Sequence, residues 1–323
     1  MHHHLFRSHA LALAASLVAA PCCFAEDAAS ASTAITEFIA PPRLALLMEE
    51  KPAAPAEPAP APDIVHFLMD VTAKTHYLTP RGLVVENEGS SIQVLTLVIV
   101  DVYQGKPEDA VNRVSVVGGM WNNFLDTAPG GQAWNEIDPI ISVEVQMWKN
   151  WIFSVTYVPF VSPPDLFDTE HNLEFKIGYD DTHLLGDFAL HPYVKPFWNF
   201  SGDSVVVLGE TPSWDFEIGI APSFTFMKDT SLPVTVTFPI FMTLGDSKFF
   251  GGGEGGVGHF SAGFEVSIPL TFIPKEWGFW KLHAGCQYFH IENESLQTAG
   301  NILSGTDSQD QYVGSFGITV FLP

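Results

Sequence analysis

Two neighbouring stretches of the chain alternate strictly between apolar and polar side chains. They are 141–147 (ISVEVQM) and 153–157 (FSVTY). A period of two predicts extended strands that each have one apolar and one polar face. An odd connection, such as 149–151, keeps the two apolar faces on the same side of the pair. The sequence therefore predicts a hairpin, and what its apolar face touches decides the fold of the chain.

The composition favours a lipid contact over a protein core. Hydrophobic residues make up 46% of the chain and charged residues 16%, whereas about 25% is the usual charged share. No run of about 20 apolar residues is present to form a membrane helix. The 26 Phe, 8 Trp, 26 Gly and 24 Pro are typical of an all-β protein with many turns. The net charge of −23 argues against nucleic acid as a partner. It fits either a solubilising acidic surface or one that attracts cations.

Residues 1–25 predict a secretory signal peptide. A basic start is followed by an apolar core and by a small-x-Ala cleavage site that ends at Ala25. Lipid attachment at Cys22 or Cys23 is the alternative to cleavage. Removal of the signal leaves Cys286 as the one cysteine, so no intramolecular disulfide is expected.

The following segment, 26–62, is rich in Pro and Ala and ends in KPAAPAEPAPAP. This composition predicts a disordered, semi-rigid linker rather than a folded domain. The folded domain is therefore expected to span 63–323.

This domain contains about twelve candidate strands. Many have about ten residues or more, the length that a tilted strand needs to cross a bilayer. They lie near 64–77, 91–103, 112–123, 136–148, 152–160, 171–179, 187–199, 213–227, 233–244, 258–270, 279–291 and 312–322. Most alternate, but the second is apolar on both faces. The pattern predicts a transmembrane, antiparallel, up-and-down β-barrel of about 12 strands.

The connections and tryptophans fit the same architecture. The connections alternate between mostly long (78–90, 124–135, 161–170, 200–212, 245–257, 292–311) and shorter (104–111, 149–151, 180–186, 228–232, 271–278). Long loops at one end and short turns at the other are typical of outer-membrane barrels. All eight Trp fall at strand ends, where indole prefers the membrane interface. The predicted aromatic girdle is Trp121, Trp134, Trp148, Trp151, Trp198, Trp214, Trp277 and Trp280.

The alternation also assigns polar residues to the barrel interior. The predicted lumen-lining residues are Asp70, Lys74, Glu144, Glu174, Lys176, His191, Lys195, Asp215, Glu217, Glu265, Lys281 and His283. Such residues either bias the passage of ions through a polar pore or pair with one another and fill the barrel. Eight strands leave a filled interior and sixteen to eighteen an open channel. Twelve strands lie between, so a narrow pore and a plugged barrel both stay open.

The stretch KTHYLTPRGLVVENEGSSIQ, residues 74–93, resembles the opening of the TorF-type (Gcw_chp) porin family. The likeness extends over roughly 64–323 and implies a barrel and a channel, without naming a solute. The residues that match the family pattern are Tyr77, Arg81, Gly82, Gln93, Glu136 and Asp138.

No motif in the sequence predicts catalysis, a cofactor or a metal. The spacing of His191, His283 and His290 matches no ligand motif. The G-x-G-x-x-G pattern within 251–258 has neither a following helix pattern nor a P-loop Lys, so it predicts a loop. No G-x-S-x-G is present.

The first hypothesis is therefore an outer-membrane barrel for passive passage of small polar solutes or ions, with a periplasmic linker and membrane lipid as its surroundings. A non-transporting structural or adhesive barrel is the second hypothesis, and an outer-membrane enzyme is the third. The oligomeric state is not specified by the sequence.

Overall fold

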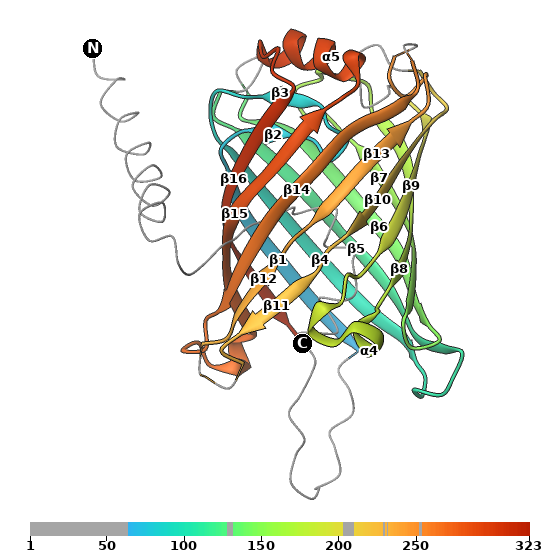
Figure 1. The fold of residues 1–323 in the computed structure, drawn as a ribbon, viewed down its shortest axis with the longest axis vertical. Helices are drawn as coiled ribbons and strands as arrows, with labels where there is room; N and C mark the ends of the chain where they lie inside the picture. The colour runs from blue at the N-terminus through green and yellow to red at the C-terminus, as the bar shows by residue number, and fades with distance from the viewer. Residues whose placement is uncertain (1–63, 128–131, 203–209, 229, 231, 252–253) are drawn as a thin grey trace, which may run out of the picture.

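The computed structural model describes residues 64–127, 132–202, 210–228, 230, 232–251 and 254–323. The signal peptide and linker predicted for 1–62 lie outside the described residues. The described chain forms a closed antiparallel β-barrel (Figure 1). Each strand pairs with its neighbour in sequence, and β1 closes the ring by pairing with β16 as well as β4.

Fourteen labelled segments build the wall. They are β1 (Val65–Lys74), β4 (Ser91–Gln104), β5 (Val111–Leu125), β6 (Trp134–Met147), β7 (Trp151–Phe160), β8 (Glu170–Tyr179), β9 (Tyr193–Ser201), β10 (Ser213–Ile220), β11 (Ser223–Phe226), β12 (Val234–Thr237), β13 (Ile240–Gly245), β14 (Gly256–Pro269), β15 (Phe279–Ile291) and β16 (Asp310–Leu322). β10 and β11 form one strand interrupted near Pro222, and β12 and β13 form one interrupted near Pro239. Proline cannot donate to a ladder and breaks strands at such points. Fourteen segments less these two breaks give the twelve predicted strands.

The two faces of the wall follow the sequence alternation. On β6, Ile141 is 61% exposed on the outer surface, whereas Ser142 is 1% exposed and faces inward. Met147 pairs with Trp151, so the β6–β7 connection is 148–150. It has three residues, an odd number as expected, and begins one residue earlier than predicted.

The interruption near Pro222 leaves part of the wall without a ladder partner. In the sheet order β11 stands at one end, paired with β12. The neighbouring strand β9 pairs with residues 213–219 of β10, and this pairing ends before β11 begins. Within the described residues, the second edge of β11 therefore faces the β8–β9 connection instead of a strand.

That connection departs from the prediction. The strand expected from 187 begins only at Tyr193, and the short turn expected at 180–186 becomes a longer segment, 180–192, with α4 (Thr182–Leu185) and η3 (Gly186–Phe188). The Asp181 carboxylate accepts backbone N–H groups from Leu190 and His191. These donors are thereby withdrawn from any strand ladder.

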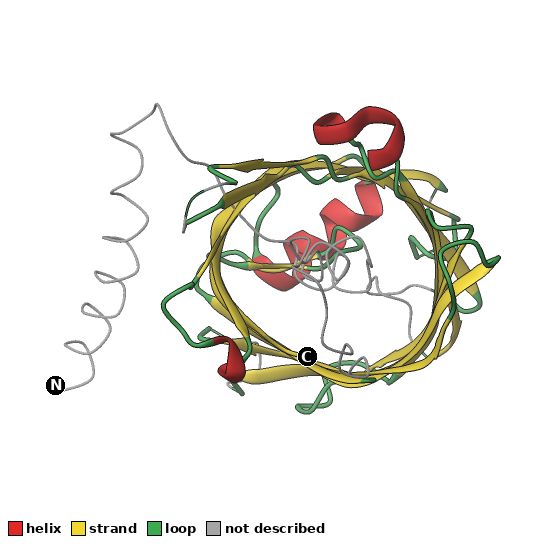
Figure 2. Ribbon diagram, turned by 90° about the horizontal axis from the view of Figure 1, so that it is seen from below, coloured by secondary structure: helices red, strands yellow, loops and turns green. Residues whose placement is uncertain are grey.

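Additional elements occupy the opposite, upper end. The β1–β4 connection forms the small hairpin β2 (Tyr77–Leu78) and β3 (Val84–Glu86), and the β15–β16 connection contains α5 (Glu294–Ser304). The sequence predicted only loops here. Asn293 caps α5 by accepting the Ser295 and Leu296 N–H groups. Seen along the barrel, α5 lies across the ring of strands (Figure 2), and it packs on β3. The remaining short helix, η4 (Lys275–Trp277), lies in the β14–β15 turn.

Two apolar clusters lie inside the ring. The first joins the upper connections to the wall, and its members are Leu78, Leu83, Val84, Phe197, Phe241, Phe249, Phe250, Phe289, Ile291, Leu296, Ala299 and Val313. The second lies mainly along β1 and β4–β7, and includes Tyr77, Leu95, Leu97, Ile99, Trp121 and Ile140. This second cluster explains why β4 is apolar on both faces: its inner face packs against protein and its outer face is exposed.

Candidate functional site in the barrel interior

Most of the predicted lumen-lining residues point inward and are buried. Nine of the twelve are buried: Asp70, Glu144, Glu174, Lys176, Lys195, Asp215, Glu217, Glu265 and His283. Lys74 and Lys281 are partly buried and hold positions of inward parity on β1 and β15. The prediction is wrong for His191, because β9 begins after it. His191 lies in the β8–β9 connection with a φ of 48°, 3.7 Å from Asp180.

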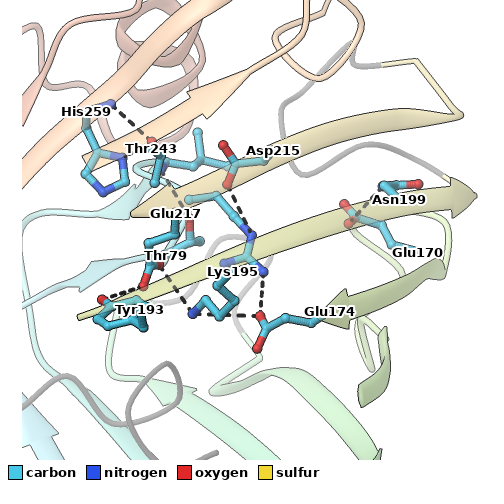
Figure 3. Close-up of polar contacts among 12 residues, drawn as sticks. Thr79, Glu170, Glu174, Tyr193, Lys195, Asn199, Asp215, Glu217, Thr243 and His259 are labelled. Carbon is cyan, nitrogen blue, oxygen red and sulfur yellow. Dashed lines mark hydrogen bonds and ion pairs between the residues drawn. The ribbon is translucent and has the colours of Figure 1, made fainter. Parts of the chain in front are cut away.

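A charge network crosses the inner face of β8, β9 and β10. The Lys195 ammonium lies 3.3 Å from Glu217 and 3.8 Å from Glu174, as Figure 3 shows. Tyr193 donates its hydroxyl to Glu217 at 2.8 Å. Successive strands thus supply opposite charges at one level, which offsets part of the cost of burying them.

Arg81 enters this network from the β2–β3 hairpin rather than from the wall. Its guanidinium donates to Glu174 at 3.0 Å, lies 3.9 Å from Asp215 and stacks 3.7 Å from the ring centroid of Phe197. The next residue, Gly82, has a φ of 90°, and a Cβ there would lie 2.6 Å from His259 Nδ1. Only glycine fits this turn, which carries Arg81 into the barrel.

A second polar group forms an upper belt on the inner wall of β4, β6 and β8. Tyr77, on the hairpin, donates its hydroxyl to Glu136 at 2.7 Å. Asp138 and Glu170 are also buried here, and Asn199 donates to Glu170 at 3.4 Å (Figure 3). Further polar atoms lack a protein hydrogen-bond partner in the described structure: Asp138 Oδ1 and both side-chain polar atoms of Gln93 and Asn172.

A lower group lies toward the end where the chain enters the barrel. Arg113 donates to Glu144 at 2.9 Å, and Ser115 donates to Asp101 at 2.6 Å. His66 lies 3.6 Å from Asp101. Arg113, Asp101 and His66 were absent from the predicted set, although their inward parity on β5, β4 and β1 was a usable signal.

A buried carboxylate–imidazole pair joins the two ends of the barrel sheet. Asp70 on β1 lies 2.9 Å from His283 Nε2 on β15 and accepts the hydroxyl of Thr319 on β16 at 2.6 Å. Thr72 also donates to Asp70, at 2.5 Å. The contact helps to hold together the strands that close the ring.

Acidic residues outnumber basic ones in the interior. The buried acidic residues other than Asp181 are Asp70, Glu86, Asp101, Glu136, Asp138, Glu144, Glu170, Glu174, Asp215, Glu217 and Glu265. The buried lysines and arginines are Arg81, Lys176 and Lys195. The partly buried Lys74, Arg113 and Lys281 also point inward. Eleven carboxylates therefore face six strong bases in these described residues, so the interior favours positive charge.

Two carboxylates outside the wall have shifted pKa values. Burial raises the pKa of Glu86 at the upper mouth, and the negative charges of Asp126 and Glu88 add to this, although hydrogen bonds from the Thr127 hydroxyl and the Glu88 backbone oppose it. Burial alone would also raise the pKa of Asp181 in the lower connection. The backbone N–H groups of Leu190 and His191 outweigh it and hold that pKa below its usual value. Asp181 therefore stays ionised as a loop-closing acceptor.

The potential ligand atoms of Asp180, Asp181 and His191 lie within 4.8 Å of one another. Both carboxylates already accept backbone N–H groups, so this group closes the connection.

The tryptophans mark both rims of the outer surface, with one exception. Trp134, Trp148, Trp151, Trp214 and Trp277 are exposed, and Trp198 stacks on Trp214 with ring centroids 5.5 Å apart. Trp280 donates its indole N–H to the Trp277 carbonyl. The prediction is wrong for Trp121. It is 1% exposed and lies inside the ring, 6.0 Å from Tyr77 between ring centroids, because its position on β5 has inward parity.

An apolar outer face around a polar, ion-paired interior, in a closed antiparallel sheet, defines a β-barrel of the membrane type. No helix in the described part of the chain is long and apolar enough to cross a membrane. No family model matches the chain, and no curated protein matches it.

Among solved structures, the beta domain of the Bordetella autotransporter Brka is similar at 11% identity and a TM-score of 0.44, covering 80% of this chain and 99% of that one. Pseudomonas putida OprB is similar at 6% identity and a TM-score of 0.36, covering 80% and 93%.

Glu174 contacts both Arg81 and Lys195, so its removal leaves two buried cations with fewer partners. We expect Glu174→Ala to lower the free energy of unfolding by about 3–5 kcal/mol. Urea unfolding of the protein refolded in lipid vesicles measures this. The control is Glu292→Ala, which removes only an exposed contact to His290. Equal shifts for the two variants would contradict a structural role for the network.

Proposed function

We propose that this protein is an outer-membrane β-barrel that provides passive passage for small polar solutes or ions, without catalysis or a cofactor. The observation that carries the proposal is the ionisable lining, which runs from Asp101 and Glu144 near the lower end to Glu136 and Glu170 near the upper end.

The lining argues for passage because it is costly for a barrel with a purely mechanical role. Buried ion pairs often contribute less stability than apolar side chains of similar volume. Ionisable residues inside membrane proteins commonly mark a path for ions or polar solutes. The unpaired polar atoms of Asp138, Gln93 and Asn172 would gain partners from such a guest.

The β2–β3 hairpin restricts this path. Arg81 is buried between Glu174, Asp215 and the Phe197 ring, and Leu78, Leu83 and Val84 pack against α5 and the wall. These contacts describe a closed arrangement, so passage requires the hairpin to move. Of the two interiors expected from twelve strands, the plugged one is the resting state in this proposal.

The resemblance to the TorF-type porins supports the same function. The residues that carry it (Tyr77, Arg81, Gly82, Gln93, Glu136 and Asp138) are all buried in the barrel interior. Two of them make the side-chain contacts that hold the hairpin, Tyr77 to Glu136 and Arg81 to Glu174. The predicted signal peptide and the lipid-compatible outer face support an outer-membrane location.

Recordings from planar lipid bilayers test the proposal. Refolded protein is expected to give small, intermittent conductance steps in KCl, because the hairpin opens only part of the time. A protein that is folded, as shown by its heat-modifiable electrophoretic mobility, yet conducts neither in its native form nor with the hairpin shortened would refute passage. It would favour the structural barrel, for which the extensive ion pairing of the interior is the supporting observation.

A further inference from the structure

The β8–β9 connection presents an unusual surface for a turn at the lower end of a barrel. Four large apolar residues are exposed within seven positions: Leu184 at 66%, Leu185 at 46%, Phe188 at 71% and Leu190 at 40%. The Asp181 carboxylate, a group that would normally face water, is instead buried. It accepts hydrogen bonds from the backbone N–H groups of Leu190 and His191. The segment thus exposes four large apolar side chains beside the exposed polar residues Thr182, His183 and Asp187.

The segment lies against the outer rim of the barrel. Figures 1 and 2 together place α4 at the lower end and outside the ring of strands. On one side, the ring of His183 packs edge-on against Tyr179. The Tyr179 ring in turn lies against the girdle residue Trp151, with ring centroids 4.8 Å apart. On the other side, the ring of Phe188 packs against the ring of Phe224 of β11, with ring centroids 5.9 Å apart. The segment therefore bridges two parts of the outward-facing surface.

The segment also lies beside the edge of β11 that has no strand partner among the described residues. Ala221, just before β11, donates its N–H to the Leu190 carbonyl at 2.8 Å. Lys228, just after β11, pairs with Asp187 of η3. An open strand edge is unfavourable in lipid because its backbone polar groups cannot reach water. An apolar segment laid beside that edge reduces this exposure.

From these contacts we propose that residues 182–190 form an interfacial anchor that inserts its Leu and Phe side chains into the lower leaflet of the membrane. The partner is lipid at the boundary between headgroups and acyl chains, where amphipathic helical segments and aromatic residues settle. Lipid is favoured over a protein partner because the exposed residues continue the outer surface on both sides, through Trp151 and through the exposed Phe226 and Met227. The inference rests on the proposed membrane location.

Spin-label depth measurements in lipid vesicles test the anchor. The native cysteines are replaced by serine, and single cysteines at Phe188, Asp187 and Ile218 are labelled in turn. Oxygen accessibility reports lipid, and accessibility to a water-soluble nickel chelate reports water. A label at position 188 is expected to favour oxygen several-fold more than a label at position 187, whose side chain is 74% exposed beside Lys228.

Ile218 on β10 is the reference for the wall, because it is exposed on the outer face. A label at 188 that reads as aqueous while the label at 218 reads as lipid would overturn the anchor and leave the membrane barrel standing. Aqueous readings at both 188 and 218 would overturn the membrane location and the anchor together. Heat-modifiable mobility on gels verifies that each labelled variant is folded.

Discussion

Replacement of residues 79–83 by two glycines is expected to raise the single-channel conductance several-fold over that of the native protein. The turn at Thr79 and Gly82 carries Arg81 into the network of Glu174 and Asp215. Without the turn, the upper interior loses both the Arg81 guanidinium and Leu83, a member of the first apolar cluster. A wider and more polar path should therefore stay open for longer.

Planar bilayer recording in KCl measures the change, and Glu88→Ala is the matched control. Glu88 lies in the same connection but is exposed, so this variant is expected to conduct like the native protein. Unchanged conductance after removal of the turn, in protein that still folds, would show that the hairpin does not limit passage.

Cations are expected to pass through the native protein in preference to anions. This preference should fall several-fold in the triple variant Glu136→Gln, Asp138→Asn, Glu170→Gln. The strong bases Arg81 and Lys195 are engaged with Glu174, Asp215 and Glu217 on the wall of β8–β10. The upper belt is acidic, and carboxylates that line a path favour cations over anions.

The reversal potential under a KCl gradient measures this preference. Amide replacements keep the size of the side chains, so the Glu136 variant can still accept the Tyr77 hydroxyl. The control is Glu292→Gln, whose side chain is exposed outside the interior. A native channel that prefers chloride, or a triple variant with unchanged selectivity, would contradict the assignment of the upper belt as the selective region.

The wall was predictable from the sequence because alternation is a local property. Each inward or outward position follows from parity once a strand is recognised, as Ile141 and Ser142 illustrate. Even the doubly apolar β4 was recognisable as a strand. Its inner face could not be explained from the sequence, since the partners Trp121 and Tyr77 come from β5 and from the hairpin.

What the sequence did not predict depends on contacts between distant segments. The inward path of Arg81 requires a space beside His259 that only a glycine at position 82 can use. Trp121 was assigned to the girdle because it lies near a strand end, but parity turns its ring inward. The helical segment at 182–188 replaced the start of a predicted strand because Asp181 captures the backbone donors of the residues that follow.

The second edge of β11, which pairs with no strand in the part of the chain that the structure describes, makes the barrel mechanically uneven. At the level of β10 and β13, strand pairing continues around the whole barrel. At the level of β11 and β12 it is interrupted beside β11, where residues 182–190 make the contact instead. Local unfolding generally begins where the backbone makes the fewest protected hydrogen bonds. Radial expansion of this protein would therefore start at its lower rim, on the side of the molecule where Phe188 meets Phe224.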